Sequence, residues 1–340
     1  MLSIPHLISE LPKAELHLHI EGTLEPELVF ELAERNRVAL AYSSVEDLRK
    51  AYVFSDLQEF LDVYYVGMQV LQTEQDFYDL ALAYFRRAKA DNVRHAEIFF
   101  DPQAHTERNI PVNVVIAGLL QAIKEASSFG ITVYLIPCFL RHLPASDAEE
   151  TLDLLLPHVQ DLHGVGLDSS ELNFPPGDFK DVFDRAASHG LRRVAHAGEE
   201  GPPDYVWQAI NDIHVDRIDH GNRALEDPSL VRELAVRQIP LTVCPLSNLK
   251  LGGVSRLRDH PLKQMLDADL LATVNSDDPA YFGGYINENY LQISDALDLS
   301  AHDIVRLAKN SFVASFLDQG TKNDWIRSIE TLEQELGVAS

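Results

Sequence analysis

The stretch AELHLHIEG, residues 14–22, has the alternating pattern of a β-strand and carries titratable side chains at every second position. In a strand, residues two positions apart point to the same face, so His17, His19 and Glu21 would share one side. Titratable side chains along one face of an otherwise apolar strand must either pair with other polar groups or serve a function. We therefore predict a strand that presents polar groups to a site.

Seven more apolar runs follow, separated by amphipathic stretches. The eight runs are residues 14–20, 93–100, 131–139, 164–170, 191–198, 216–221, 239–246 and 270–278. Strands that alternate with helices form parallel sheets, and eight such units are typical of a closed (β/α)8 barrel. No low-complexity linker or compositional break interrupts the chain, so we predict an α/β protein with a single TIM-barrel domain over residues 1–340.

The first gap between predicted strands, from about residue 20 to about residue 93, is too long for one helix. It contains several amphipathic patterns, so we expect a helical insertion over about residues 24–90, on the face where a barrel's active site lies. Its aromatic residues Phe60, Tyr64 and Tyr65 would either form a lid over that site or pack in an ordinary core. From about residue 300 onward, helices are expected on the outside of the barrel.

The charge balance restricts the partners of the chain. It has 28 Lys and Arg against 53 Asp and Glu, a formal net charge of −25 at pH 7. Nucleic acid and anionic membranes are bound by basic surfaces, so neither is expected as a partner. Because the sequence shows neither a signal peptide nor a membrane-spanning run, a cytoplasmic location is the default expectation. The oligomeric state, including a homo-oligomer, is left open.

Polar side chains gather at the carboxyl ends of the predicted strands, where active sites of this fold are built. Those of metal-binding type are His17 and His19 on the first strand, His196 on the fifth and Asp277 on the eighth. Each alone has an ordinary explanation, such as a solvated histidine or a helix N-cap. Together, three imidazoles and one carboxylate suit one Zn²⁺, with Fe²⁺ or Mn²⁺ as alternatives. Such an ion would lower the pKa of a bound water toward ~7 and provide a hydroxide nucleophile.

Further strand-end residues are suited to move protons near such an ion. Glu199 lies three residues after His196 and would reach the substrate, and His220 is placed to hold and deprotonate the attacking water. Asp278 would form a hydrogen bond at one edge of the substrate. The fourth strand end, GLDSSELN, has no lysine to bridge two metals, so one metal per chain is predicted. The set indicates hydrolytic attack on an electrophilic carbon.

The motifs ELHLHIEGTL, VAHAGEE, RIDHG, CPLSN and TVNSDDPAYF occur in this order and together resemble the adenosine and adenine deaminase branch of the amidohydrolase superfamily. The resemblance runs from about residue 11 to about residue 315. It implies one Zn²⁺ on the four ligands named above and loss of the 6-amino group of a purine as ammonia. It also implies Glu199 as the proton shuttle to the purine ring, His220 as the residue that orients the water, and Asp278 as a partner of an imidazole-ring nitrogen.

Two departures from the adenosine deaminase pattern concern the substrate. Adenosine deaminases have an aspartate that meets the ribose where this chain has Glu21, whose longer side chain would crowd that space. At the fourth strand, Ser170 and Glu171 replace a small Ala-Gly pair. Both features resemble the adenine deaminase subgroup. We expect Glu171 to accept a hydrogen bond from the N–H that free adenine has and adenosine lacks; alternatively, it caps the loop NFPPGD.

The expected function is zinc-dependent deamination of adenine, a small purine base, to hypoxanthine and ammonia in purine salvage. Within the family, adenosine deaminase is one alternative, disfavoured by Glu21 and the Ser170–Glu171 pair. Deamination of N6-substituted adenines such as cytokinins is another, because the leaving-group pocket depends on how the lid packs. A third alternative is a catalytically silent barrel that binds purines or metal. Glu199 and His220 weigh against it, since a binding protein needs neither.

Overall fold

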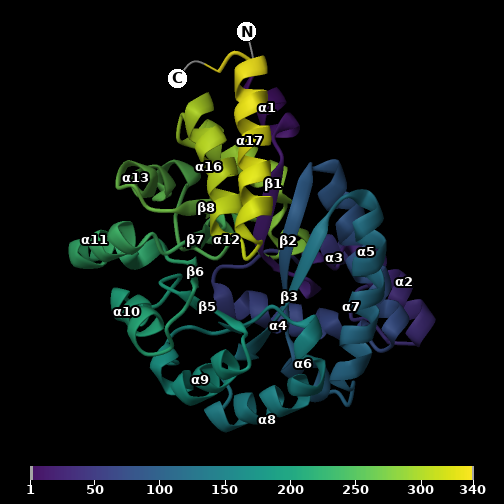
Figure 1. The fold of residues 1–340 in the computed structure, drawn as a ribbon. Coiled ribbons are helices and arrows are strands. Elements are labelled where there is room, and N and C mark those ends of the chain that lie inside the picture. The colour runs from purple at the N-terminus through teal and green to yellow at the C-terminus, as the bar shows by residue number, and fades with distance from the viewer. Residues whose placement is uncertain (1–2, 339–340) are drawn as a thin grey trace.

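Eight parallel strands form the centre of the molecule in a computed structural model, which describes residues 3–338 (Figure 1). They hydrogen-bond in sequence order from β1 to β8, and a bridge between Leu18 and Asp277 joins the two ends. The predicted (β/α)8 TIM barrel is confirmed. The strands are β1 (Lys13–His19), β2 (Val93–Phe100), β3 (Thr132–Leu140), β4 (Gly164–Asp168), β5 (Arg192–Ala197), β6 (Arg217–His220), β7 (Leu241–Val243) and β8 (Ala272–Val274).

Helices cover the outside of the strands, which explains why most strand residues are apolar on both faces. The ring comprises α5 (Glu74–Ala90), α7 (Val112–Ala126), α8 (Ala145–Leu155), α9 (Lys180–Ser188), α10 (Pro203–Asn211), α11 (Pro228–Arg237), α13 (Leu262–Asp267) and α16 (Ala301–Ala314). α5 and α7 pack closely at Gly118, where a Cβ would lie 2.3 Å from the carbonyl oxygen of Glu74.

The carboxyl-terminal helices lie outside the barrel, as expected. α16 packs against β1 and β8, and α17 (Gln319–Glu335) packs on α16, where the rings of Phe312 and Trp325 stack 5.6 Å apart. Figure 1 shows α17 in yellow and α16 in yellow-green, next to the amino-terminal α1 (Ile4–Glu10). The last turn of α1 and the chain that follows are held by Lys13, whose Nζ donates to the carbonyl oxygens of Ile8 and Leu11.

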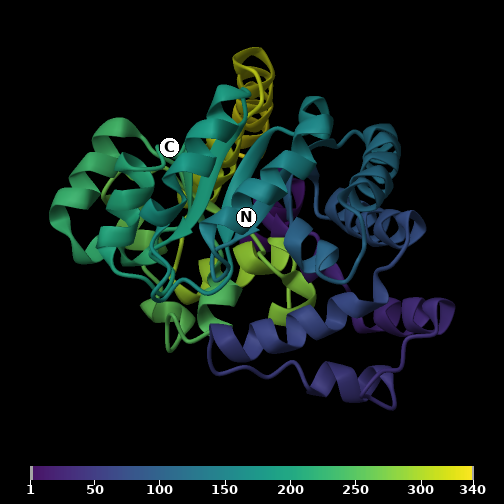
Figure 2. The ribbon, with the colours of Figure 1, turned by 90° about the horizontal axis from the view of Figure 1, so that it is seen from below.

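The segment expected as one insertion, residues 24–90, divides into two parts. α5 lies in the ring as the helix of the first βα unit. The helices α2 (Pro26–Asn36), α3 (Val45–Lys50) and α4 (Leu57–Gly67) lie together along one edge of the molecule, at the bottom of Figure 2. α4 packs on α14 (Pro279–Phe282), where Phe60 stands 4.7 Å from Phe282 between ring centroids.

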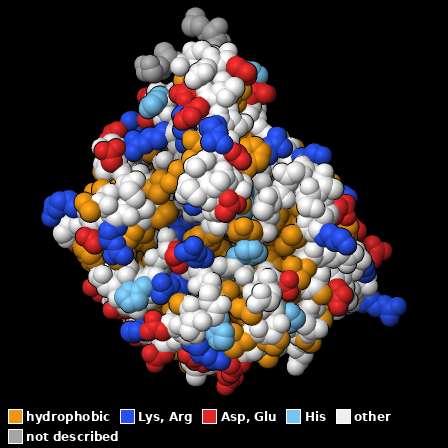
Figure 3. Space-filling model, viewed as in Figure 1, with side chains coloured by type: hydrophobic (Ala, Val, Ile, Leu, Met, Phe, Trp, Pro, Cys, Tyr) orange, Lys and Arg blue, Asp and Glu red, His pale blue; other side chains and the backbone are white. Residues whose placement is uncertain are grey.

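Short elements complete the described chain. They are α6 (Pro102–Thr106), α12 (Pro245–Lys250), α15 (Ile286–Ala296) and the 3-10 turns Glu21–Thr23, Met68–Val70, Ser127–Phe129, Leu156–Asp161, Pro176–Phe179, Asn222–Glu226 and Leu257–Asp259. Within residues 3–338, no helix combines the length and the apolar character needed to cross a membrane. On the face shown in Figure 3, acidic and basic side chains are interspersed.

Candidate active site

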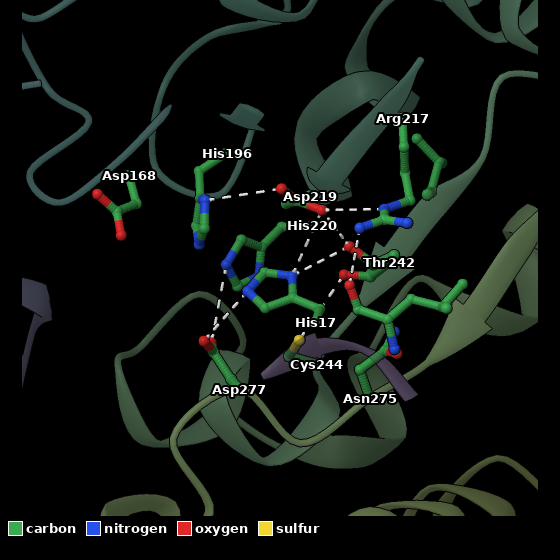
Figure 4. A network of polar contacts seen from close by, with 12 residues as sticks. His17, Asp168, His196, Arg217, Asp219, His220, Thr242, Cys244, Asn275 and Asp277 are labelled. Atoms are coloured by element: carbon green, nitrogen blue, oxygen red, sulfur yellow. Dashed lines mark hydrogen bonds and ion pairs between the residues drawn. The ribbon is translucent and has the colours of Figure 1, made fainter. Parts of the chain in front are cut away.

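The four residues predicted to bind metal lie together at the carboxyl end of the barrel. One ligand atom from each of His17, His19, His196 and Asp277 lies within 4.8 Å of the others, and all four side chains are buried. The carboxylate atom Asp277 Oδ1 is 3.1 Å from His17 Nε2 and 3.5 Å from His19 Nε2. Figure 4 shows imidazole rings from separate strands converging on this carboxylate.

The second nitrogen of His17 has a partner that determines its tautomer. Thr242 donates its hydroxyl proton to Asp219 Oδ1 at 2.7 Å, so its oxygen is free to accept from His17 Nδ1 at 3.0 Å. His17 therefore carries its proton on Nδ1, and its Nε2 lone pair faces Asp277. Among the described residues, this buried Nε2 has no hydrogen-bond partner. An orphaned basic nitrogen of this kind fits a metal ligand.

The other two histidines have the same arrangement. His196 Nδ1 lies 3.1 Å from the carbonyl oxygen of Leu167, which can only accept, so His196 also exposes an Nε2 lone pair. His19 Nδ1 faces a carboxylate oxygen of Asp168 at 3.5 Å. The Nε2 atoms of His19 and His196 stand 3.2 Å apart. Three imidazole nitrogens and one carboxylate oxygen directed at one point fit a mononuclear divalent ion such as Zn²⁺.

Three residues that line the pocket have strained backbone. Ser169, His220 and Asp277 all have left-handed backbone, with φ of 73°, 64° and 64°. For residues with a side chain this conformation costs on the order of 1–2 kcal/mol. The three follow or end β4, β6 and β8, and all three line one pocket. At these three positions, strained backbone accompanies a residue that lines the pocket.

Glu199 and His220, the predicted proton carriers, meet in this pocket. Glu199 Oε2 lies 3.4 Å from His220 Nε2, and both side chains are buried. Burial, reinforced by the charge of Asp277, raises the pKa of Glu199 well above its usual value. The carboxyl group therefore keeps its proton to a higher pH than an ordinary glutamate does. It can supply a proton to a ligand in the pocket.

A chain of hydrogen bonds sets the tautomer of His220. The backbone N–H of Leu262 donates to His260 Nδ1 at 3.1 Å, so His260 carries its proton on Nε2. That proton is donated to Asn248 Oδ1 at 3.2 Å, which directs the Asn248 amide N–H toward His220 Nδ1 at 3.3 Å. His220 Nδ1 must therefore accept. Burial lowers the pKa of His220 to about 3, so the ring is neutral and its single proton is on Nε2.

This tautomer corrects one expectation. A neutral His220 whose Nε2 carries hydrogen donates into the pocket and has no lone pair there to take a proton from water. The residue can orient an oxygen atom by donating to it. The remaining acid–base group on this side of the pocket is Glu199.

Asp278 lies where a substrate-edge residue is expected. It lines the pocket, is buried, and its Oδ1 has no hydrogen-bond partner within residues 3–338. Gly22 packs directly against it, because a Cβ at Gly22 would stand 2.0 Å from that oxygen. The glycine of the first motif therefore makes room for Asp278.

The structure contradicts the substrate contact predicted for Glu171. Its Oε1 accepts the backbone N–H of Gly198 at 2.7 Å, and its Oε2 accepts those of Glu199, Glu200 and Gly201 at 3.0, 2.8 and 2.8 Å. Both oxygens are used, and the residue does not line the pocket. Glu171 is a cap, as the alternative held, but of the loop that carries Glu199 and not of NFPPGD.

Glu21 and Ser170 also differ from expectation. Glu21 lies behind the pocket wall, where its Oε1 accepts from His105 Nε2 at 2.7 Å and from the backbone N–H of Asp101 at 3.2 Å. Ser170 faces α4, 3.2 Å from Gln58 Oε1. Neither side chain lines the pocket. Glu21 therefore affects the pocket only through its hydrogen bond to the backbone of Asp101, the residue that follows β2.

Three pocket residues were not assigned a role from the sequence, namely Asp101, Asp168 and Ser169. Burial, then the charge of Asp168, raises the pKa of Asp101 well above its usual value, and burial raises the pKa of Asp168 to about 7. The hydroxyl of Ser169 is 2.8 Å from His142 Nδ1. Their only sequence signal is a position at a strand end. Leu57, Phe60 and Tyr64 of α4, with Leu251, complete the lining.

Comparisons with known proteins agree with this geometry. A family model described as adenosine deaminase matches residues 12–332. An adenine deaminase of Sphingopyxis alaskensis is 61% identical over 324 residues, which are 95% of this chain and 95% of that protein. The crystal structure of an adenine deaminase from Arthrobacter aurescens has a TM-score of 0.94 and 49% identity, covering 95% of this chain and 99% of that one. An amidohydrolase structure from Burkholderia ambifaria with bound Zn has a TM-score of 0.90 and 26% identity, covering 100% of this chain and 96% of that one.

Proposed function

The chain belongs to the adenosine deaminase family, and we propose that within it the reaction is hydrolysis of adenine to hypoxanthine and ammonia, with one Zn²⁺ per chain. The similarity to adenine deaminases over 95% of the chain supports the substrate. The zinc-bound relative and the converging Nε2 lone pairs support the metal. A role in purine salvage and a cytoplasmic location stay predictions from the sequence.

The chemistry follows from the groups around the pocket. A divalent ion on the three histidines and Asp277 would, when bound, polarise water into a nucleophile at neutral pH. Glu199, held protonated, would deliver its proton to N1 of the purine, which makes C6 electrophilic. His220 would donate from Nε2 to the oxygen that C6 receives, and Asp278 would form a hydrogen bond at N7. As the C6–O bond forms, one proton of the attacking water would return to the Glu199 carboxylate, and the other would pass to N6 as the C6–N6 bond breaks, so that the amino group leaves as ammonia.

One observation carries this proposal. A buried acid, Glu199, lines the same pocket as His19, His196 and Asp277, three of the four converging metal-binding groups. A protein that only binds purines would not need a carboxyl group kept protonated beside the metal-binding groups. The structure therefore favours an enzyme over a silent barrel.

Substrate preference gives the test. The metal-loaded protein is assayed for ammonia or alkylamine release from adenine, adenosine and N6-methyladenine. We expect kcat/KM to be highest for adenine by at least tenfold. A higher value for adenosine would move the chain to the adenosine deaminases, and a higher value for N6-methyladenine would support the N6-substituted alternative.

A further inference from the structure

Two buried acidic side chains in the pocket have no part in the reaction as proposed. Asp101 follows β2, Asp168 ends β4, and both line the pocket with only 1% and 2% of their surface exposed. Within residues 3–338, Asp101 Oδ1 and Asp168 Oδ1 have no hydrogen-bond partner. Buried acceptors without partners are costly, so a ligand that supplies N–H groups at this wall would be favoured.

The order of strands around the barrel indicates which part of a purine reaches them. Passing from β5 through β4 and β2 to β1 and β8, the pocket presents in succession Glu199, Asp168, Asp101 and Asp278. The ring nitrogens of a purine follow one another around its perimeter as N1, N3, N9 and N7. With N1 at Glu199 and N7 at Asp278, N3 lies beside the end of β4 and N9 beside the end of β2.

We propose that Asp101 accepts a hydrogen bond from N9–H of free adenine and thereby selects the free base over 9-substituted purines. This inference rests on the proposed function, because it uses the contacts at N1 and N7. A 9-substituent removes the donor, leaves the buried Asp101 oxygen without a partner, and puts carbon where the carboxyl group stands. The selectivity expected of Glu171 from the sequence is thereby assigned to a residue on another strand.

The surroundings of Asp101 suit a fixed acceptor. Glu21 Oε1 accepts the backbone N–H of Asp101 at 3.2 Å and is itself held by His105, which anchors the turn after β2. Arg108 donates to His105 Nδ1 at 2.7 Å, so His105 must donate from Nε2 to Glu21. A rigid turn keeps the carboxyl group from moving aside for a larger substituent.

The test compares adenine with 9-methyladenine, which differs from it only at N9. The metal-loaded wild type, Asp101→Ala and Asp101→Asn are assayed for ammonia release from both compounds. We expect the wild type to prefer adenine in kcat/KM by at least roughly a hundredfold. Asp101→Ala should lower kcat/KM for adenine roughly tenfold to a hundredfold and leave that for 9-methyladenine unchanged or higher. The ratio should thus fall at least tenfold, and Asp101→Asn, which keeps an acceptor oxygen, should lie between.

Controls separate selectivity from folding. Asp267→Ala removes an exposed carboxylate paired with Lys263 and should leave both rates as in the wild type. Metal content and Tm of each variant are measured alongside. An equal loss on both compounds in Asp101→Ala, or a wild type that accepts 9-methyladenine as well as adenine, would overturn the role of Asp101. A correctly folded, metal-loaded wild type that releases no ammonia from adenine would overturn the proposed function, and this inference with it.

Discussion

At His220, the direction of a single hydrogen bond decides what the imidazole can do. The chain from the Leu262 N–H through His260 and Asn248 leaves Nε2 as the donor that faces Glu199. A ring that donates can stabilise negative charge on an oxygen, whereas a ring that accepts can remove a proton. His260 and Asn248 act through His220 and are positioning residues.

Replacing Asn248 by aspartate inverts this arrangement while changing little in shape. In Asn248→Asp the new carboxylate would accept a proton from His220 Nδ1, so Nε2 would lose its hydrogen. We expect kcat for adenine to fall roughly tenfold or more, by analogy with the effect of lost orienting partners at metal sites. Ammonia release gives kcat, and ¹⁵N chemical shifts of His220 give the tautomer. An increased kcat in this variant would show that His220 works as a base.

Glu199 provides the second prediction at this scale. Glu199→Gln keeps the shape and removes the transferable proton, so kcat should fall by ~10²–10⁴ while binding of hypoxanthine is retained. Because burial raises the pKa of Glu199, the acid form persists to higher pH than in an ordinary glutamate and is lost as pH rises through that pKa. Activity should therefore decline on the alkaline side, and Glu199→Gln should lack this decline. Glu200→Gln, at the neighbouring half-buried position, is the matched control and should retain activity.

Individual residues show where prediction from the sequence succeeds and where it fails. His17 and His19 were predictable because alternation in a strand fixes which side chains share a face. Where the Glu171 side chain points could not be predicted, because its four hydrogen-bond donors are backbone amides of residues 198–201, which lie beyond the next helix and strand in the sequence. Ser170 was expected at the substrate from the resemblance to the family, whereas the serine that lines the pocket is Ser169, whose left-handed backbone follows β4.

Among the elements, the turns after β4 and β5 act as one unit. Glu171 from the first turn gathers four amides of the second and so fixes the place from which Glu199 enters the pocket. Arg141 adds to this unit by donating to the carbonyl oxygens of Phe174 and His196. The catalytic acid is therefore held by a neighbouring βα turn.

Glu171→Gln tests this arrangement. The new amide group would place its own N–H against backbone N–H groups and leave some of them without an acceptor. We expect a loss of about 1–3 kcal/mol in the free energy of unfolding and a reduced kcat. The ratio of kcat/KM for adenine and adenosine should stay as in the wild type, since Glu171 does not line the pocket. A changed ratio would restore Glu171 as a substrate contact.

The aromatic residues of α4 were expected either to form a lid over the site or to pack in an ordinary core, and the structure shows that these two roles are compatible. Phe60 and Tyr64 pack with Tyr281 and Phe282 in a core, and the same two side chains line the pocket. We propose that α4 is the cover of the site. Amphipathic periodicity predicted the helix, but its contact with α14 joins segments over 200 residues apart, which local sequence patterns do not report.

Across the whole molecule, the barrel was predictable from eight repeated apolar runs, because parallel strands buried on both faces leave a simple pattern. The shortness of β7 and β8 was not predictable. The chain after β7 enters α12, which carries the buried Asn248, and the run 270–278 continues after β8 as a buried turn that carries Asp277. Polar pocket residues interrupt the strands at the end where the site is built. The predicted runs therefore exceed the observed strands most at β7 and β8.

The metal site joins parts of the barrel that are far apart in sequence, and this leads to a prediction for the entire fold. The proposed ligands come from β1, β5 and the turn after β8, beside the bridge that closes the barrel at Leu18 and Asp277. A metal that binds only the folded chain stabilises it by about 2.7 kcal/mol at a hundredfold excess over its Kd.

Chelation should thus abolish ammonia release and lower Tm, and metal analysis of reconstituted protein should give one ion per chain. Reconstituting the metal-free protein separately with Zn²⁺, Fe²⁺ and Mn²⁺ and measuring activity would rank the three metals. The variant His17→Asn should bind none of them. As a control, His302→Asn changes an exposed histidine and should behave as the wild type. Full activity in a demonstrably metal-free chain would refute the site.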